Sequence, residues 1–319
     1  MAKKSNTVKE IIQIVVFLLV VGILLTAFVI YPLGTSKDMF ARTDLDDFNP
    51  DSIGVNDATA FVEAGFLVDT FTVEPETLTK LAAVRLEPAA DDSTALPPQA
   101  WRGTAILLPD EHQTRQSVIP MARALVDSGF AVITYDQRAT GLSTGEYHSD
   151  GQYEATDLAE MISYLRFREL IRHPFVAVGH RAGGDAVLLE AIEDPRLDGV
   201  AAIQPYLSTD RWMEYHMDQH GMWWIPFPYT VTWFWYGMRS DYAAPYREVD
   251  AIQGVPLPAL LVIEDETRET DEFERLAELT DDDLLTDITM PPDDQQLVNA
   301  VMDFVLSLEQ PAADTMTTE

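Results

Sequence analysis

The sequence contains no cysteine among its 319 residues. This absence excludes a disulfide framework, a structural thiolate metal site and a cysteine nucleophile. Basic residues are also scarce, because 21 lysines and arginines stand against 53 aspartates and glutamates, which gives a formal net charge of -32. Such a charge argues against nucleic acid or an anionic lipid surface as a partner of the folded part. It indicates a heavily solvated surface, of a kind suited to high salt.

The residues from Ile11 to Tyr31 carry no formal charge and are rich in valine, isoleucine, leucine and phenylalanine. About twenty apolar residues are enough to cross a hydrocarbon core as a helix. Lys3, Lys4 and Lys9 precede this stretch, whereas aspartates accumulate after Lys37. The positive-inside rule therefore predicts a single-pass cell-membrane protein with a cytoplasmic N-terminus and a periplasmic or extracellular domain. A cleaved signal peptide is the alternative, but the stretch is long for one and no A-x-A site follows it.

Composition divides the chain into five segments. The region after the apolar stretch is polar and acidic with scattered proline and glycine, which is typical of a linker. The expected order is a cytoplasmic tail (1–10), a transmembrane helix (11–32), an acidic linker (33–58), one α/β domain (59–308) and a disordered C-terminal tail (309–319).

Short β-rich runs alternate with helical stretches through the predicted domain. An antiparallel pair opens it, a surface loop follows at 89–99, and strands then alternate with helices. Strands are expected at 66–73, 78–86, 104–108, 130–135, 200–203 and 259–263 and immediately before Gly179, and helices at 118–128, 153–168 and 185–192. Alternation of this kind predicts a mostly parallel sheet flanked by helices.

The most informative stretch is FVAVGHRAGG at 175–184, which predicts a buried strand that runs straight into a helix. Its GHRAG core has the spacing of G-x-S-x-G, in which a strained turn lifts a nucleophile above a parallel sheet. The central residue here is Arg181. A guanidinium stays protonated and cannot attack a carbonyl carbon, so the scaffold of the motif is present without its nucleophile.

A second segment, GFAVITYDQRATGLSTG at 129–145, is similar to the G-(Y/F)-x-V-x-x-x-D-x-R-G-x-G-x-S-x-G segment of α/β-hydrolases. Residues 255–263 resemble the strand that precedes the catalytic acid of that superfamily. Together with GHRAG, these segments resemble its membrane-anchored Bem46-like and serine aminopeptidase-like group across 64–308. The resemblance implies the α/β-hydrolase fold with a helical, aromatic-rich cap inserted at about 207–250.

Three catalytic positions implied by the resemblance are replaced. The nucleophile position holds Arg181, and the oxyanion loop, usually His-Gly, contains Asp110 and Glu111, whose carboxylates would repel an oxyanion. The loop expected to carry the catalytic histidine reads TMPPD at 289–293, and no histidine follows His220. With three such losses the triad mechanism is not expected.

Arg181 is expected to occupy the former active site with a carboxylate partner. A remnant of the catalytic acid is predicted at Asp265 or Glu266, and Asp110 and Glu111 are the other candidates for a charge-assisted pair. The alternative is an arginine that reaches solvent through an open pocket.

The segment MWWIPFPYTVTWFWY at 222–236 contains Trp223, Trp224, Trp233 and Trp235, four of the six tryptophans of the chain. It is too short and too proline-broken to span a bilayer. Three interpretations remain open: the core of the cap, an interfacial belt in lipid headgroups, and a docking surface for a protein partner.

His216 and His220 have a spacing that could place two imidazoles on one helical face, but a clear third ligand is missing, so no metal and no cofactor are predicted. The sequence favours a membrane-anchored pseudoenzyme, a binding or accessory subunit of a membrane protein complex that contacts a protein partner in the membrane. Its ligand is not identified. The alternative is an active hydrolase of esterase or peptidase type with relocated catalytic groups.

Overall fold

The computed structural model divides the chain into two compact units. The first comprises 1–41 with 213–245, and the second comprises 42–212 with 246–319. The residues that the structure describes are 2–31, 33–34, 58–74, 79–91, 94–145, 147–219, 232, 234 and 254–308.

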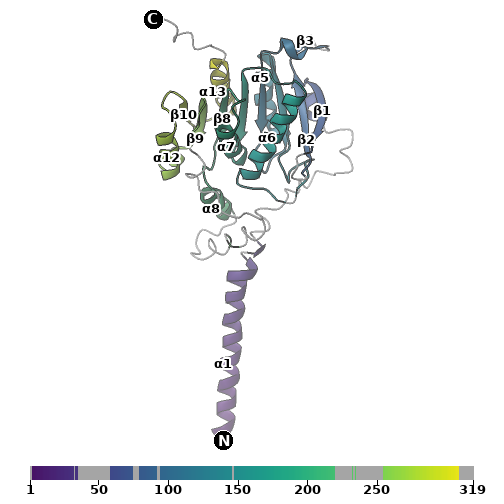
Figure 1. The fold of residues 1–319 in the computed structure, drawn as a ribbon. Helices are drawn as coiled ribbons and strands as arrows, with labels where there is room; N and C mark the ends of the chain where they lie inside the picture. Colours follow the sequence, from purple (N-terminus) through teal and green to yellow (C-terminus); the bar gives the residue numbers. More distant parts are fainter. Residues whose placement is uncertain are drawn as a thin grey trace. The chain divides into compact units, whose positions relative to one another are not determined.

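The first unit contains one long apolar helix, drawn in purple in Figure 1. Helix α1 spans Ala2–Leu25 and continues as the π-helical turn η1 at Thr26–Ile30. Its span Lys9–Ile30 has a mean hydropathy of 2.9 and is exposed along its length. This helix is long and apolar enough to cross a membrane, as a signal anchor or a signal peptide would be. The helix begins at Ala2, before the apolar span itself.

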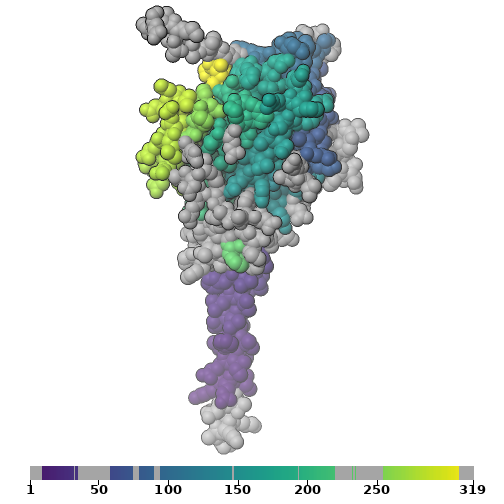
Figure 2. Space-filling model, in the orientation of Figure 1, coloured from purple at the N-terminus to yellow at the C-terminus, as the bar shows by residue number. Residues whose placement is uncertain are grey.

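The second unit is built on an eight-stranded sheet in the order β1-β2-β6-β5-β7-β8-β9-β10. Strands β1 and β2 pair antiparallel, as do β2 and β6, and all later neighbours are parallel. The strands are β1 (Leu67–Val73), β2 (Leu81–Glu87), β5 (Gly103–Leu108), β6 (Phe130–Tyr135), β7 (Phe175–His180), β8 (Gly199–Ile203), β9 (Ala259–Ile263) and β10 (Leu285–Thr289). The predicted antiparallel pair and mostly parallel sheet are confirmed. Figure 2 shows the early strands (blue) and the last strands (yellow-green) at opposite edges.

Helices cover both faces of this sheet (Figure 1). The helices of the second unit are α4 (Thr59–Glu63), η3 (Pro98–Ala100), η4 (Arg115–Val118), α5 (Ile119–Asp127), α6 (Gln152–Phe167), α7 (Ala182–Glu193), the first part of α8 (Thr209–Gln219), α11 (Asp265–Arg268), α12 (Asp271–Leu279) and α13 (Asp294–Ser307). Successive β5 residues point to opposite faces. Ile106 packs in the core under α6 and α7, and Leu107 packs in the core under α5 and α13.

Three predicted segments differ from the structure or lie outside the described residues. The predicted surface loop at 89–99 contains a short hairpin of β3 (Ala89–Asp91) and β4 (Thr94–Ala95). Most of the predicted cap lies outside the described residues, including Trp223, Trp224, Trp233 and Trp235. The C-terminal tail at 309–319 lies outside them as well.

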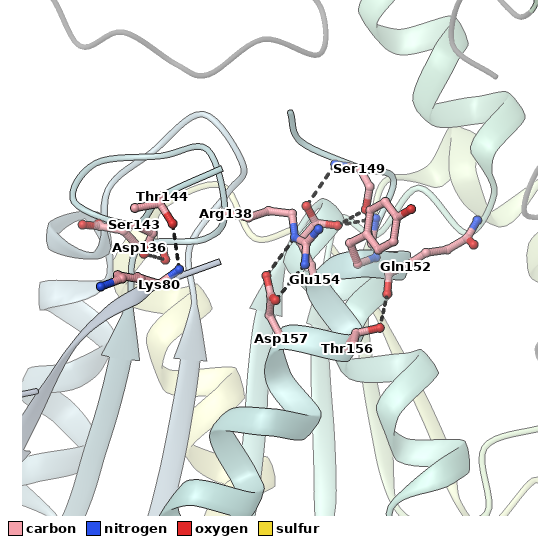
Figure 3. Close-up of polar contacts among 12 residues, drawn as sticks. Lys80, Asp136, Arg138, Ser143, Thr144, Ser149, Gln152, Glu154, Thr156 and Asp157 are labelled. Atoms are coloured by element: carbon pink, nitrogen blue, oxygen red, sulfur yellow. Dashed lines mark hydrogen bonds and ion pairs between the residues drawn. The ribbon is translucent and has the colours of Figure 1, made fainter. Parts of the chain in front are cut away.

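Buried polar pairs hold the loop between β6 and α6 in place (Figure 3). Arg138 donates from Nε and Nη2 to the two carboxylate oxygens of Asp157, at 2.8 and 2.7 Å. The backbone N–H of Ser149 donates to Glu154 Oε1 at 3.0 Å. These bonds fix the start of α6 against the end of β6, because both partners of each pair are buried and hydrogen-bonded.

Asp150, in the same loop, is almost fully buried and accepts a hydrogen bond from the Thr209 hydroxyl. Burial, and to a lesser extent the charge of Glu154, raise the pKa of Asp150 to about 6, although the hydrogen bond from Thr209 lowers it. The ordinary value is 3.8. Between these two pH values the folded chain keeps a proton that the unfolded chain has lost, so stability falls as pH rises through this range.

We therefore expect Asp150→Asn to stabilise the protein above pH 6, because the amide can still accept the Thr209 hydrogen bond without a buried charge. The difference between the folded-state pKa of about 6 and the ordinary value of 3.8 corresponds to a gain in stability of roughly 3 kcal/mol. Thermal melts should show a higher midpoint than wild type at pH 8 and no gain at pH 4. The exposed Asp282→Asn is the control and should show no such pH-dependent gain. An equal midpoint for Asp150→Asn and wild type at pH 8 contradicts the prediction.

Candidate functional site

The site lies at the carboxyl edge of the parallel strands, where loops after β5, β7 and β8 meet. In open α/β sheets this edge is where ligands bind. The loop after β5 carries Asp110 and Glu111, β7 ends at His180 and is followed by Arg181, and the loop after β8 carries Tyr206. Side chains from three separate strands therefore converge on one point.

The turn between β7 and α7 has the geometry that the GHRAG spacing predicts. Arg181 has φ 52° and ψ −118°, a conformation that side-chain-bearing residues rarely adopt and that costs about 1–3 kcal/mol. A Cβ at Gly179 would lie 1.9 Å from the carbonyl oxygen of Gly183, and a Cβ at Gly183 would lie 2.8 Å from Gln137 Nε2. The close backbone approach therefore requires glycine at position 179, whereas at position 183 a side chain would first meet the end of the Gln137 side chain.

Arg181 forms an ion pair with Asp110. Its Nε lies 3.2 Å from Asp110 Oδ2, and His180 Nδ1 lies 3.6 Å from the same oxygen. The backbone N–H of His112 donates to Asp110 Oδ1 at 3.1 Å. Burial raises the pKa of Asp110, but hydrogen bonds from His180, Glu111 and the His112 backbone outweigh it and hold this pKa well below its usual range. Asp110 is therefore an ionised carboxylate at this edge.

Glu111 is fully buried beside it. The backbone N–H of Ala182 donates to Glu111 Oε2 at 3.3 Å, and the Tyr206 hydroxyl donates to Oε1 at 2.8 Å. Burial and the neighbouring charge of Asp110 raise the pKa of Glu111 well above its ordinary value. Two adjacent carboxyl groups thus have pKa values pushed apart, with the charge on Asp110 and the proton on Glu111.

Tyr206 is held in position by Asp185 on α7. The backbone N–H groups of Tyr206 and Leu207 donate to the two oxygens of Asp185, at 3.0 and 2.7 Å. Arg181 Nη1 also lies 3.5 Å from the Tyr206 hydroxyl. Carboxylate oxygens are potential metal ligands. Those of Asp110 and Glu111 already contact Arg181, Tyr206 and backbone N–H donors.

Comparison with known proteins supports the same fold as the strand order and the turn between β7 and α7. A family model described as serine aminopeptidase, S33, matches residues 102–250. The chain therefore has the α/β-hydrolase fold. No curated protein matches the sequence at a comparable level of significance.

Several solved α/β-hydrolase structures share the fold at low sequence identity. An esterase from Pyrococcus furiosus has a TM-score of 0.59 and 15% identity, over 82% of this chain and 94% of the esterase. The proline iminopeptidase of Mycobacterium smegmatis has a TM-score of 0.51 and 14% identity, over 76% and 99% of the two chains. Est1E from Butyrivibrio proteoclasticus, solved with ferulic acid bound, has a TM-score of 0.54 and 15% identity, over 75% and 98%. At these identities the likeness concerns the fold alone.

The two carboxylates expected as remnants of an α/β-hydrolase acid lie away from Arg181. Asp265 Oδ1 accepts hydrogen bonds from Arg268 Nη1 at 3.3 Å and from the Thr289 hydroxyl at 3.0 Å. Glu266 is exposed, and among the described residues it has no partner. Of the four carboxylates expected as partners of Arg181, Asp110 forms the ion pair with it. The reason is local, because Arg268 stands one helical turn after Asp265 and reaches it first.

Two residues of the site are not predicted from the sequence. His180 directly precedes Arg181 in the GHRAG motif, so its position at the end of a predicted strand could have indicated that it belongs to the site. Tyr206 stands three residues after the end of β8, and only the order of the strands brings it beside Glu111.

We expect Arg181→Ala to lower the free energy of unfolding by about 1–3 kcal/mol, because it leaves the mostly buried charge of Asp110 without its guanidinium. Asp110→Asn should also destabilise, and the double variant should lose less than the sum by at least about 1 kcal/mol. Denaturant titrations of all four proteins measure this coupling.

The control cycle uses Arg268→Ala and Asp287→Asn. These side chains pair at 2.6 Å but are 34% and 36% exposed, so their coupling should stay below about 1 kcal/mol. An unchanged unfolding free energy for Arg181→Ala, or strict additivity with Asp110→Asn, would refute the energetic role of the pair.

Proposed function

We propose that this α/β-hydrolase-fold protein does not hydrolyse its ligands and acts as a binding or accessory subunit. The observation that carries the proposal is the hydrogen bond from the Ala182 N–H to Glu111. In a G-x-S-x-G hydrolase the N–H that follows the nucleophile stabilises the oxyanion. In this chain a carboxyl group of the protein itself occupies that donor.

The other groups at the edge support the same proposal. Arg181 offers no nucleophilic lone pair, and the ionised Asp110 would disfavour negative charge developing on a substrate oxygen. Losing one oxyanion donor alone costs a hydrolase about 10²–10³ in kcat. Replacement of both the nucleophile and the donor leaves no route through an acyl-enzyme at this position.

An active hydrolase with relocated groups is the second candidate. The specific observation in its favour is His180, whose Nδ1 faces the ionised Asp110 as a general base faces its orienting acid. This candidate would also need a nucleophile or an activated water beside His180.

We expect the purified protein to show no turnover of p-nitrophenyl esters or aminoacyl-nitroanilides beyond that of Arg181→Ala. It should also stay unlabelled by fluorophosphonate probes. Arg181→Ser should remain inactive as well, because Glu111 still occupies the Ala182 N–H and no histidine follows His220. Turnover by wild type that His180→Ala abolishes would establish the second candidate instead.

We further propose that α1 anchors the chain as a single cell-membrane span, with a cytoplasmic N-terminus and an extracytoplasmic domain that contacts a membrane protein. The exposed apolar span of α1 and the lysines at its start support this topology. The acidic composition disfavours anionic lipid as the contact and favours a protein, with Trp223 and Trp224 as expected contact residues.

Native membranes washed with alkaline carbonate should retain the full-length chain, because the span is buried in lipid. Detergent extracts of these membranes should yield it in a stoichiometric complex. Substitution of Trp223 and Trp224 by serine should reduce recovery of the partner while circular dichroism stays unchanged. A soluble chain that lacks the N-terminal helix contradicts the anchor, and a lone protein in the extract contradicts the subunit role.

A further inference from the structure

A cavity of about 310 Å³ lies beside the site, between the sheet and the helices α5 and α13. Its walls are mostly apolar and include Leu107, Met121, Val178, Ile203 and Val298. Ligand pockets begin at about this size. A water molecule takes roughly 30 Å³, so the cavity has room for about ten non-hydrogen atoms.

His180, at the end of β7, is one of the polar residues that line the cavity, together with Asp110, Gln113, Ser117 and Asp294. Its Nδ1 lies 3.6 Å from Asp110 Oδ2, and both residues line the cavity. Because Nδ1 faces this carboxylate, Nε2 is the ring nitrogen left for a ligand, and it accepts a hydrogen bond in the tautomer that carries its proton on Nδ1. An acceptor at the end of an apolar cavity selects a ligand whose polar end donates a hydrogen bond.

Charge at the cavity selects against anions. Asp294 lines this cavity and an adjoining one of about 380 Å³ between α5 and α13, which also shares Pro120 and Val298. Asp294 has no hydrogen-bond or ion-pair partner within the part of the chain that the structure describes, so its charge is uncompensated there. A carboxylate ligand would meet this charge.

Cations are disfavoured at the end of the cavity beside His180, for a different reason. Arg181 already compensates Asp110 at 3.2 Å, so an ammonium group beside His180 would lose its hydration without gaining a free counter-charge. An uncharged donor meets neither penalty.

We propose that this cavity binds an uncharged amphiphile of up to about ten non-hydrogen atoms, an aliphatic alcohol in chemical class, whose hydroxyl donates to His180 Nε2. The proposal deepens the proposed binding role and rests on it, since the ligand is held and not converted. An alcohol has no hydrolysable bond, so a binding test fails or succeeds independently of the activity test.

The test compares hexan-1-ol, hexylammonium and hexanoate by calorimetric titration of the full-length protein in detergent. Hexan-1-ol should bind at least tenfold more tightly than either charged probe. His180→Ala should weaken hexan-1-ol about fivefold or more, because one hydrogen bond is lost. Partition of the probe into detergent is the same for every variant and cancels in the comparison.

His173→Ala is the matched control. His173 also faces an aspartate through Nδ1, at 2.5 Å from Asp198, but it is 63% exposed and does not line the cavity. Its variant should bind hexan-1-ol as wild type does. Ser117→Trp is a second test that leaves His180 in place, because Ser117 is exposed and lines the cavity, so a large side chain should block it without disturbing the core.

Three results would overturn the proposal. The first is no binding of hexan-1-ol to wild type up to its solubility limit. The second is binding of hexanoate or hexylammonium as tight as that of hexan-1-ol. The third is unaltered binding in both His180→Ala and Ser117→Trp.

Discussion

The carboxyl edge of the sheet depends on the charge balance among Asp110, Glu111 and Arg181. Two acids and one guanidinium meet there, largely shielded from water, and a second ionised carboxylate would be uncompensated. The proton on Glu111 removes that charge, and the Ala182 N–H and the Tyr206 hydroxyl fill its oxygens. Asp185 in turn fixes Tyr206 through two backbone hydrogen bonds. Each of these buried polar groups is therefore held in position by a hydrogen bond or an ion pair with another group of the same site.

The backbone of the turn is preserved independently of this chemistry. Gly179 is required by its contact with the backbone of Gly183, and this contact is the same whatever side chain stands at position 181. The strained conformation of Arg181 persists because the strand and the helix on either side are fixed by packing. The geometry of the turn therefore does not depend on which side chain stands at its centre.

The sequence predicted the buried strands well and the exposed ones poorly. Strands β5 and β7 are apolar along their whole length, and this pattern is visible without the structure. Strand β10 reads LTDIT and is half exposed at the edge of the sheet, so its pattern resembles that of a loop. The hairpin of β3 and β4 was not predicted either, because both strands are too short to show a recognisable pattern.

By itself the sequence determined the alternation of strands and helices, the strained turn at GHRAG and the absence of a nucleophile, because spacing and residue type are local properties. It also narrowed the partner of Arg181 to four carboxylates. Only the tertiary structure decided among them, since β5 lies beside β7 in the sheet and places Asp110 within reach, whereas Asp265 is engaged by Arg268. The same holds for Tyr206 and for the cavity beside His180, because contacts between residues far apart in the chain follow from strand order and burial, which no local pattern encodes.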